Sequence, residues 1–73
     1  MLRMKAERLR LGLTQQALGY HAHISAADIS RFEGGWARPY LGQARRLAEV
    51  LGLCESELLE DADNWEGSHV GAK

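Results

Sequence analysis

The sequence predicts an all-α fold in which five short helices form one compact domain. Apolar residues recur at three- and four-residue steps along most of the chain, and hydroxyl residues stand where two central helices would begin. Glycines follow two of the apolar stretches, where helices commonly end. A chain of 73 residues has room for one small core. We therefore expect residues 1–60 to form the domain and residues 61–73 to form an acidic, flexible C-terminal tail.

The first helix is expected from about Leu2 to Leu11. Leu2, Ala6 and Leu9 lie at helical spacing and predict one buried stripe. Gly12 stands where this helix would end, because glycine readily adopts the left-handed conformation of a C-terminal cap. The stripe suits packing against the rest of the domain.

The central motif is a pair of helices joined by a tight turn. The first is expected over residues 15–22, after Thr14, and the second from Ser25 to about Phe32 or Glu33. Thr14 and Ser25 can each accept hydrogen bonds from the free N–H groups of a helix start. The two hydroxyl residues therefore mark two helix starts eleven residues apart.

Two further helices are expected after the loop that ends at Pro39. Pro39 can pre-set the start of a helix over about residues 40–51. A fifth helix is expected over residues 55–60, where Cys54-x-x-Glu57 resembles a weakened capping box. Apolar residues at helical spacing predict the buried stripe of the fourth helix: Leu41, Ala44, Leu47, Ala48 and Leu51.

The charge of the chain is divided between its two parts. Residues 1–46 hold eight Lys and Arg against three Asp and Glu, a net charge of +5, whereas residues 47–73 carry −6. A basic front can face phosphates while an acidic rear turns away from them. The formal net charge of −1 predicts weak non-specific binding to nucleic acid and a modest dependence on salt.

Other classes of function find little support in the sequence. No run of 18 apolar residues and no signal-peptide pattern occurs, so a cytoplasmic protein is expected. The lone Cys54 cannot form an internal disulfide, and the histidines lack the spacing of a metal site. Neither Ser25 nor Ser30 has an evident base with an orienting acid. We expect no enzyme activity, no metal and no cofactor.

Several segments together resemble the lambda-repressor and Cro (XRE-type) family of helix-turn-helix proteins. Leu13-Thr14-Gln15 is similar to the opening of that family's second helix, and Ile29-Ser30-Arg31-Phe32-Glu33 to the end of its recognition helix. Glu33-Gly34-Gly35, Pro39 and the last two helices extend the resemblance over about residues 2–59. The resemblance implies a sequence-specific DNA-binding transcriptional regulator, a repressor or controller, that reads the major groove of double-stranded DNA as a homodimer.

The resemblance also implies two structural roles. Members of the family usually carry Gly in the turn, where φ is positive, and His23 stands there. Arg8 and Glu33 correspond to an ion pair that ties the first helix to the end of the recognition helix. The alternative is that Arg8 and Glu33 are two independent surface charges.

Candidate DNA contacts follow from the same resemblance. Gln15 is placed to meet a phosphate through its N–H and its side-chain amide, and Gln16 is placed to assist or to reach a base edge. The fork of Arg31 suits guanine O6 and N7, with a phosphate contact as the alternative. Asp28 either accepts from a cytosine amino group or forms a capping box with Ser25.

The rest of the predicted interface is less specific. Ala26 and Ala27 offer only a methyl contact to thymine. Trp36 either donates its indole N–H to a phosphate or packs over the apolar edge of the domain. The remaining candidates for backbone contacts are Ser25, Ser30, Arg38 and Tyr40.

The dimer interface is expected at the fifth helix. Its apolar candidates are Leu53, Leu58 and Trp65, whereas Leu59 is expected to face the core. An alternative function is a protein-interaction module that has kept the fold and lost DNA binding, since two alanines and an acid occupy the reading face. A second alternative is an antitoxin-like regulator whose tail around Trp65 binds a partner protein.

Overall fold

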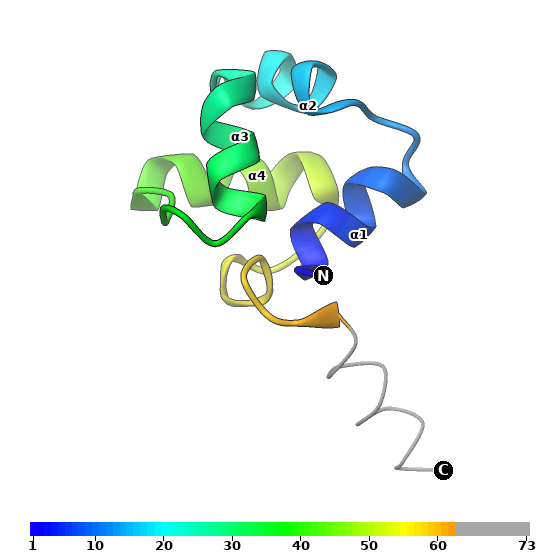
Figure 1. Ribbon diagram of the computed structural model, residues 1–73, viewed down its shortest axis with the longest axis vertical. Coiled ribbons are helices and arrows are strands. Elements are labelled where there is room, and N and C mark those ends of the chain that lie inside the picture. Colours follow the sequence, from blue (N-terminus) through cyan, green and yellow to red (C-terminus); the bar gives the residue numbers. More distant parts are fainter. Residues whose placement is uncertain (63–73) are drawn as a thin grey trace, which may run out of the picture.

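The computed structural model describes residues 1–62. This part of the chain contains four α-helices and one 3-10 turn, namely α1 (Arg3–Arg10), α2 (Gln15–Ala22), α3 (Ala26–Glu33), α4 (Leu41–Leu51) and η1 (Glu55–Glu57). Within the described residues the only extended pairing is an isolated antiparallel bridge between Leu2 and Asp61. Figure 1 shows α2 at the top of the domain with α3 descending beside it, and α4 passes behind the lower end of α3 toward α1. No helix in residues 1–62 has the length and apolarity needed to cross a membrane.

The two central helices begin where the hydroxyl residues predict. Thr14 Oγ1 accepts a hydrogen bond from the Ala17 N–H at 3.0 Å, and Ser25 Oγ accepts one from the Asp28 N–H at 3.1 Å. Each bond satisfies an N–H group that has no partner within its own helix. The predicted starts of both helices are therefore confirmed.

The turn between α2 and α3 depends on two unusual backbone positions. His23 has φ 59° and ψ 44°, and it is the one non-glycine residue with positive φ in residues 1–62. The predicted positive φ of His23 is thus confirmed. At Gly19 the backbones approach so closely that an added Cβ would lie 2.2 Å from the Ile24 carbonyl oxygen. The tight crossing of α2 and α3 therefore requires a residue without a side chain at position 19.

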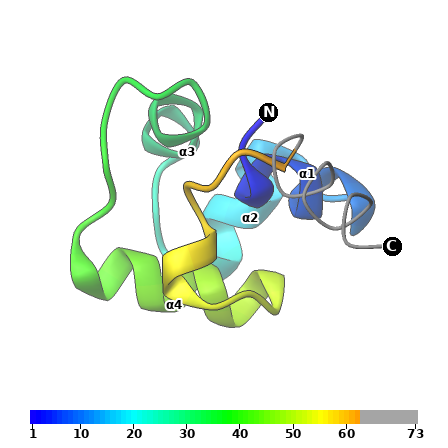
Figure 2. The ribbon, with the colours of Figure 1, turned by 90° about the horizontal axis from the view of Figure 1, so that it is seen from below.

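The core is formed by one cluster of buried apolar side chains contributed by every helix. Its members are Met4, Leu18, Ala22, Ile24, Ile29, Phe32, Leu47, Ala48, Leu51 and Leu58. Ile29 and Phe32 face inward from α3, so the opposite side of that helix remains at the surface. Figure 2 shows α3 at one edge of the domain, joined to α4 by a long loop.

The buried face of α1 differs from the predicted stripe. Leu9 is 50% exposed, whereas Met4 and Arg8 are buried one helical turn apart. The rotation of α1 is set by its first turn, where the Arg3 N–H donates to the Glu60 carbonyl at 2.8 Å and the Met4 N–H donates to the Leu58 carbonyl at 3.1 Å. These bonds join residues more than fifty positions apart, so helical periodicity alone could not reveal them.

The fourth helix lies where the sequence predicts it, and it begins one residue after Tyr40. Pro39 lies before the cap, Tyr40 is the N-cap, and the helix begins at Leu41. The Tyr40 N–H donates to Gln43 Oε1 at 2.8 Å, which satisfies one free donor of the helix start. Leu41, the first residue of the helix, is 63% exposed. The predicted stripe therefore loses its first member.

The fifth helix is replaced by the single 3-10 turn η1. The Cys54 N–H donates to Glu57 Oε1 at 2.7 Å, which is one half of the predicted capping box. A 3-10 turn has three residues per turn, so the faces predicted from α-helical spacing do not apply. Leu58 is 1% exposed and lies in the core, whereas Leu59 only packs against it. The predicted place of Leu58 in a dimer interface was therefore wrong, whereas Leu59 lies against the core as expected.

The C-terminal end of the described chain is hydrogen-bonded to the N-terminal residues and the start of α1. Arg3 Nη1 donates to Glu57 Oε2 at 2.6 Å, and the Ala62 N–H donates to the Met1 carbonyl at 2.8 Å. The Cys54 N–H, and then the Arg3 guanidinium, hold the pKa of Glu57 below its ordinary value. Segments from the two ends of the domain thus stabilise each other.

Candidate nucleic-acid interface

The outward face of α3 is open along its length. Ala27, Ser30 and Arg31 are exposed, and Ala26 and Asp28 are partly exposed. The long buried side chains of this helix point to the other side. Small residues near the start of α3 leave its backbone accessible, so this face can approach a groove closely.

Asp28 and Arg31 form an ion pair on this face. Arg31 Nη1 lies 2.8 Å from Asp28 Oδ1, and the two side chains are 61% and 40% exposed. The cap of α3 is made by the Ser25 hydroxyl and the backbone N–H of Asp28, not by the Asp28 carboxylate. The sequence offered base reading and capping for Asp28, and it did not reveal the pairing with Arg31.

Arg8 and Glu33 form a buried salt bridge. Arg8 Nε lies 2.7 Å from Glu33 Oε2 and Nη2 lies 3.1 Å from Oε1, with the side chains only 7% and 3% exposed. Arg8 Nη1 also donates to the Leu13 carbonyl at 2.7 Å. This bidentate arrangement joins α1, the loop before α2 and the end of α3. It fixes the position of α3 against the rest of the domain.

Gln15 belongs to the same network. Its Nε2 donates to Glu33 Oε1 at 3.1 Å, so one N–H of the amide is directed into the domain. The backbone N–H groups of Gln15 and Gln16 precede the Ala17 N–H, which Thr14 caps. They are the donors that the first turn of α2 can offer to a phosphate. Gln16 is exposed beside them.

The loop after α3 brings further polar groups beside the outward face of α3, which we call the reading face. A hollow of about 170 Å³ is lined by Asp28, Arg31, Phe32, Ala37, Arg38, Tyr40 and Gln43. The structure therefore brings Arg31, Arg38 and Tyr40 together, although Arg38 and Tyr40 lie on a different segment from Arg31. Arg38 is exposed, and Tyr40 is 79% exposed.

Trp36 does not cover the apolar edge of the domain. It is 86% exposed, so the packing alternative for this side chain was wrong. Its backbone N–H donates to the Arg31 carbonyl at 2.8 Å, which holds the loop against the end of α3 while the side chain projects outward. Trp36 remains a candidate for a phosphate contact.

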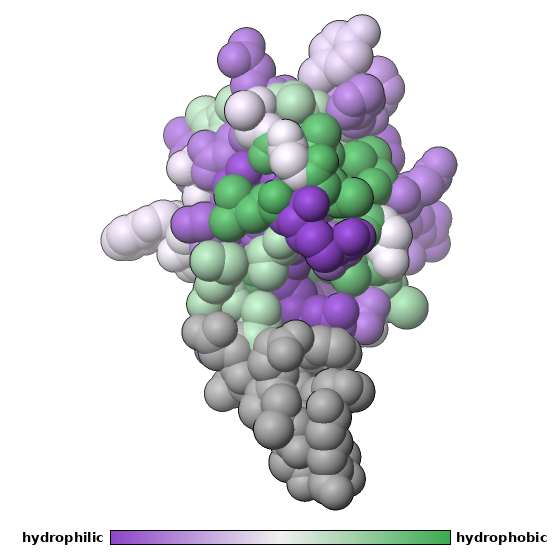
Figure 3. All heavy atoms as spheres, turned by 90° about the vertical axis from the view of Figure 1, so that its right-hand side faces the viewer, coloured by the Kyte–Doolittle hydropathy of each residue, from purple (hydrophilic) through white to green (hydrophobic). Residues whose placement is uncertain are grey.

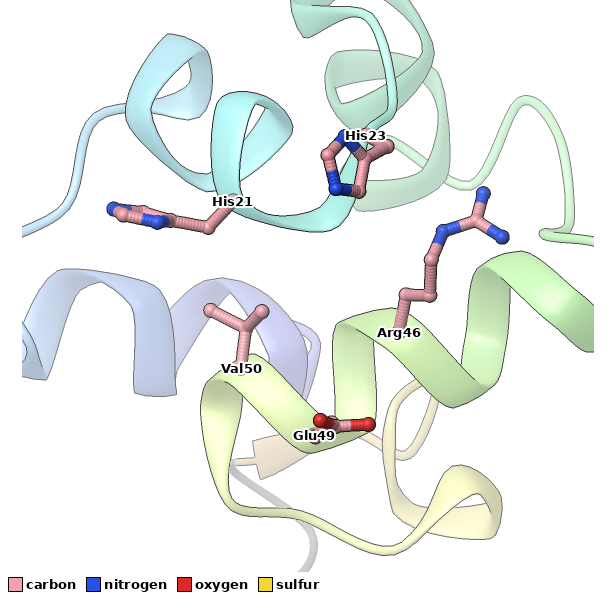
Figure 4. Close-up of a pocket in the computed structure, with 5 residues that line it drawn as sticks. All are labelled: His21, His23, Arg46, Glu49 and Val50. Atoms are coloured by element: carbon pink, nitrogen blue, oxygen red, sulfur yellow. The ribbon is translucent and has the colours of Figure 1, made fainter.

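A second hollow lies between the end of α2 and α4. It has a volume of about 290 Å³ and is lined by His21, His23, Arg46, Glu49 and Val50. Figure 4 shows Arg46 reaching from α4 toward the turn after α2, with His21 and His23 set well apart. Arg46 Nε donates to the Ala22 carbonyl at 2.7 Å, which satisfies an acceptor at the end of α2. This contact joins residues twenty-four positions apart, and Arg46 is otherwise exposed.

The candidates for a dimer interface are only partly at the surface. Leu53 is half-buried against the core, Leu58 is buried, and Trp65 lies outside the described residues. Figure 3 shows hydrophobic surface gathered on the side of the domain that faces right in Figure 1. Leu9 and Leu11 are 50% and 42% exposed, and the sequence singled out neither of them as a surface residue.

Comparison with known proteins agrees with this geometry. A family model described as a helix-turn-helix domain matches residues 2–61, which include all four α-helices and η1. No curated protein and no solved structure shows a significant match to the chain.

Proposed function

The chain belongs to the helix-turn-helix domain family, and on that premise we propose that it is a sequence-specific transcriptional regulator, a repressor or controller, that reads the major groove with α3. The observation that carries the proposal is the grouping of Arg31, Arg38 and Tyr40 around one hollow beside the open face of α3. A cationic fork on the helix and a second cation on the adjoining loop suit a base edge and the phosphates beside it.

Phosphate contacts are proposed on both sides of α3. On one side are the N–H groups of Gln15 and Gln16 at the start of α2, where the helix dipole favours an anion. On the other side are Arg38, Tyr40 and the indole N–H of Trp36. Contacts on two sides fix the register of the recognition helix without reading sequence.

Base reading is proposed for few side chains. Arg31 reads a guanine, while Ala26 and Ala27 make methyl contacts with thymine. Ser25 and Ser30 are proposed to contact the backbone. Specificity from one monomer is thus low, and we propose a homodimer that binds two half-sites about one helical turn, roughly 34–36 Å, apart. Leu53 and Trp65 remain candidates for its interface, and Leu58 is withdrawn because it is buried.

The first experiment is selection of duplexes from a randomised library by the whole purified chain, at low salt and at roughly 0.15 M salt. We expect an enriched inverted repeat that survives the higher salt. Arg31→Ala should then reduce the preference at one base pair per half-site by about 5- to 150-fold, since a bidentate contact contributes about 1–3 kcal/mol. Arg38→Ala should weaken binding to all sequences alike.

Arg10→Ala is the matched control, because Arg10 is an exposed arginine on α1, paired with Glu7, away from α3. It should leave both affinity and preference unchanged. Binding at low salt without enrichment would reduce the activity to the electrostatic attraction of phosphates. Absence of binding at both salt concentrations would contradict the proposal and favour a protein-interaction module on the same fold.

A further inference from the structure

We propose that Asp28 is a positioning residue, whose carboxylate holds Arg31 in the orientation in which the guanidinium reads a guanine. The inference rests on the proposed function, since it concerns how α3 discriminates between bases. It assigns to Asp28 neither a contact with DNA nor a role in capping the helix.

The geometry of the pair leaves the reading edge of Arg31 free. Only Nη1 of Arg31 donates to Asp28, and the distance to Oδ1 is 2.8 Å. The edge formed by Nε and Nη2 therefore keeps both of its donors. Guanine offers two acceptors in the major groove, O6 and N7, and two parallel donors on one edge of a guanidinium match them.

The carboxylate of Asp28 has no competing role in the described part of the chain. The helix cap uses the backbone N–H of Asp28 and the hydroxyl of Ser25, and the one hydrogen bond of the carboxylate goes to Arg31. A carboxylate beside two phosphate strands is repelled, so a direct contact with the backbone is unfavourable. Pairing with an arginine reduces this repulsion.

The Asp28–Arg31 pair affects the preference for guanine and the affinity for DNA in opposite directions. An arginine side chain has many rotamers, and holding it in one of them lowers the entropy lost when it meets a base. The carboxylate also cancels the positive charge that would attract any phosphate. Asp28 therefore increases the preference for guanine while it lowers the affinity for DNA of unrelated sequence.

The test compares Asp28→Ala, Asp28→Asn, Arg31→Ala and the Asp28→Ala/Arg31→Ala double variant on the selected duplex. Each is also measured on a duplex changed at the base pair that depends on Arg31, and on an unrelated duplex. Asp28→Ala should lower the preference at that base pair about two- to fivefold, the range of an exposed ion pair, while binding to the unrelated duplex is kept or strengthened. Asp28→Asn retains an acceptor oxygen and should lose less. In the Arg31→Ala background, Asp28→Ala should not change the preference further.

Glu7→Ala is the matched control, because Glu7 and Arg10 form a second i,i+3 pair on α1. It should alter no preference. If Asp28→Ala lowers affinity for all duplexes equally, together with the thermal midpoint, Asp28 acts only through helix stability and the inference is overturned. It is also overturned if no base pair depends on Arg31. A wild-type chain that selects no duplex would instead refute the proposed function, and the two failures are distinguishable.

Discussion

Arg8→Ala is the substitution for which the structure predicts the largest effect on stability. The change removes both hydrogen bonds from Arg8 to the Glu33 carboxylate and the bond to the Leu13 carbonyl. The Glu33 side chain is 3% exposed, so its charge would remain buried with Gln15 as its single hydrogen-bond partner. An unpaired buried charge is costly, because neither water nor a cation compensates its desolvation.

The expected loss is about 3–5 kcal/mol, the range for breaking a buried ion pair by removing one partner. A domain of this size has a total stability of only about 5–15 kcal/mol. For domains of about 60–100 residues, 1 kcal/mol shifts the thermal midpoint by about 4–8 °C, so a shift of at least roughly 12 °C is expected. At the low end of that stability range, a substantial part of the Arg8→Ala population would be unfolded at physiological temperature.

Urea and thermal unfolding followed by far-ultraviolet circular dichroism measure this loss. Arg10→Ala is the matched control on the same helix, because the Arg10 side chain is 66% exposed and pairs with Glu7 at the surface. It should change stability by no more than about 0.5 kcal/mol. The double variant Arg8→Met/Glu33→Leu should recover most of the loss, since apolar residues can replace a buried pair at little cost. Equal midpoints for Arg8→Ala and Arg10→Ala would refute the reasoning.

Three further predictions test local features. Gly19→Ala should destabilise the domain by about 1–3 kcal/mol because of the close backbone approach. Gly42→Ala should stabilise it by about 0.4–1 kcal/mol, because the added Cβ would meet only a flexible side chain at 3.6 Å. Urea unfolding should therefore give changes in stability of opposite sign for the two variants. His23→Gly should stabilise the domain by roughly 0.5–1 kcal/mol, because glycine adopts the left-handed conformation without strain. A destabilised variant would show that the His23 side chain contributes more to stability than its backbone strain costs. The Cys54 N–H lowers the pKa of Glu57 in the folded chain, so the stability that this carboxylate contributes is present above the ordinary carboxyl pKa and is lost as pH falls through the lowered value. Glu57→Ala should therefore lose less stability than the wild type in that pH window. Parallel pH profiles of stability for the two chains would contradict this prediction.

The reading face illustrates how far the sequence could predict a site. The residues of α3 and its borders follow from local signals, namely the Ser25 cap and the inward spacing of Ile29 and Phe32. The sequence could not show that Arg38 lies beside Arg31, because the loop between them has no periodicity. It also left the role of Asp28 open between capping and base reading, and it did not reveal the pairing with Arg31.

The sequence by itself determined the features that depend on neighbouring residues. Hydroxyl caps and helical spacing act over a few positions, and they were sufficient for the class of fold and for the central motif, while the family resemblance implied the left-handed turn at His23. Only the tertiary structure decided which face of α1 is buried, that Leu58 enters the core, and that Arg46 caps the end of α2. Each of these outcomes depends on contacts between residues twenty or more positions apart. Local propensity contains no information about such contacts, because they form only when the helices pack.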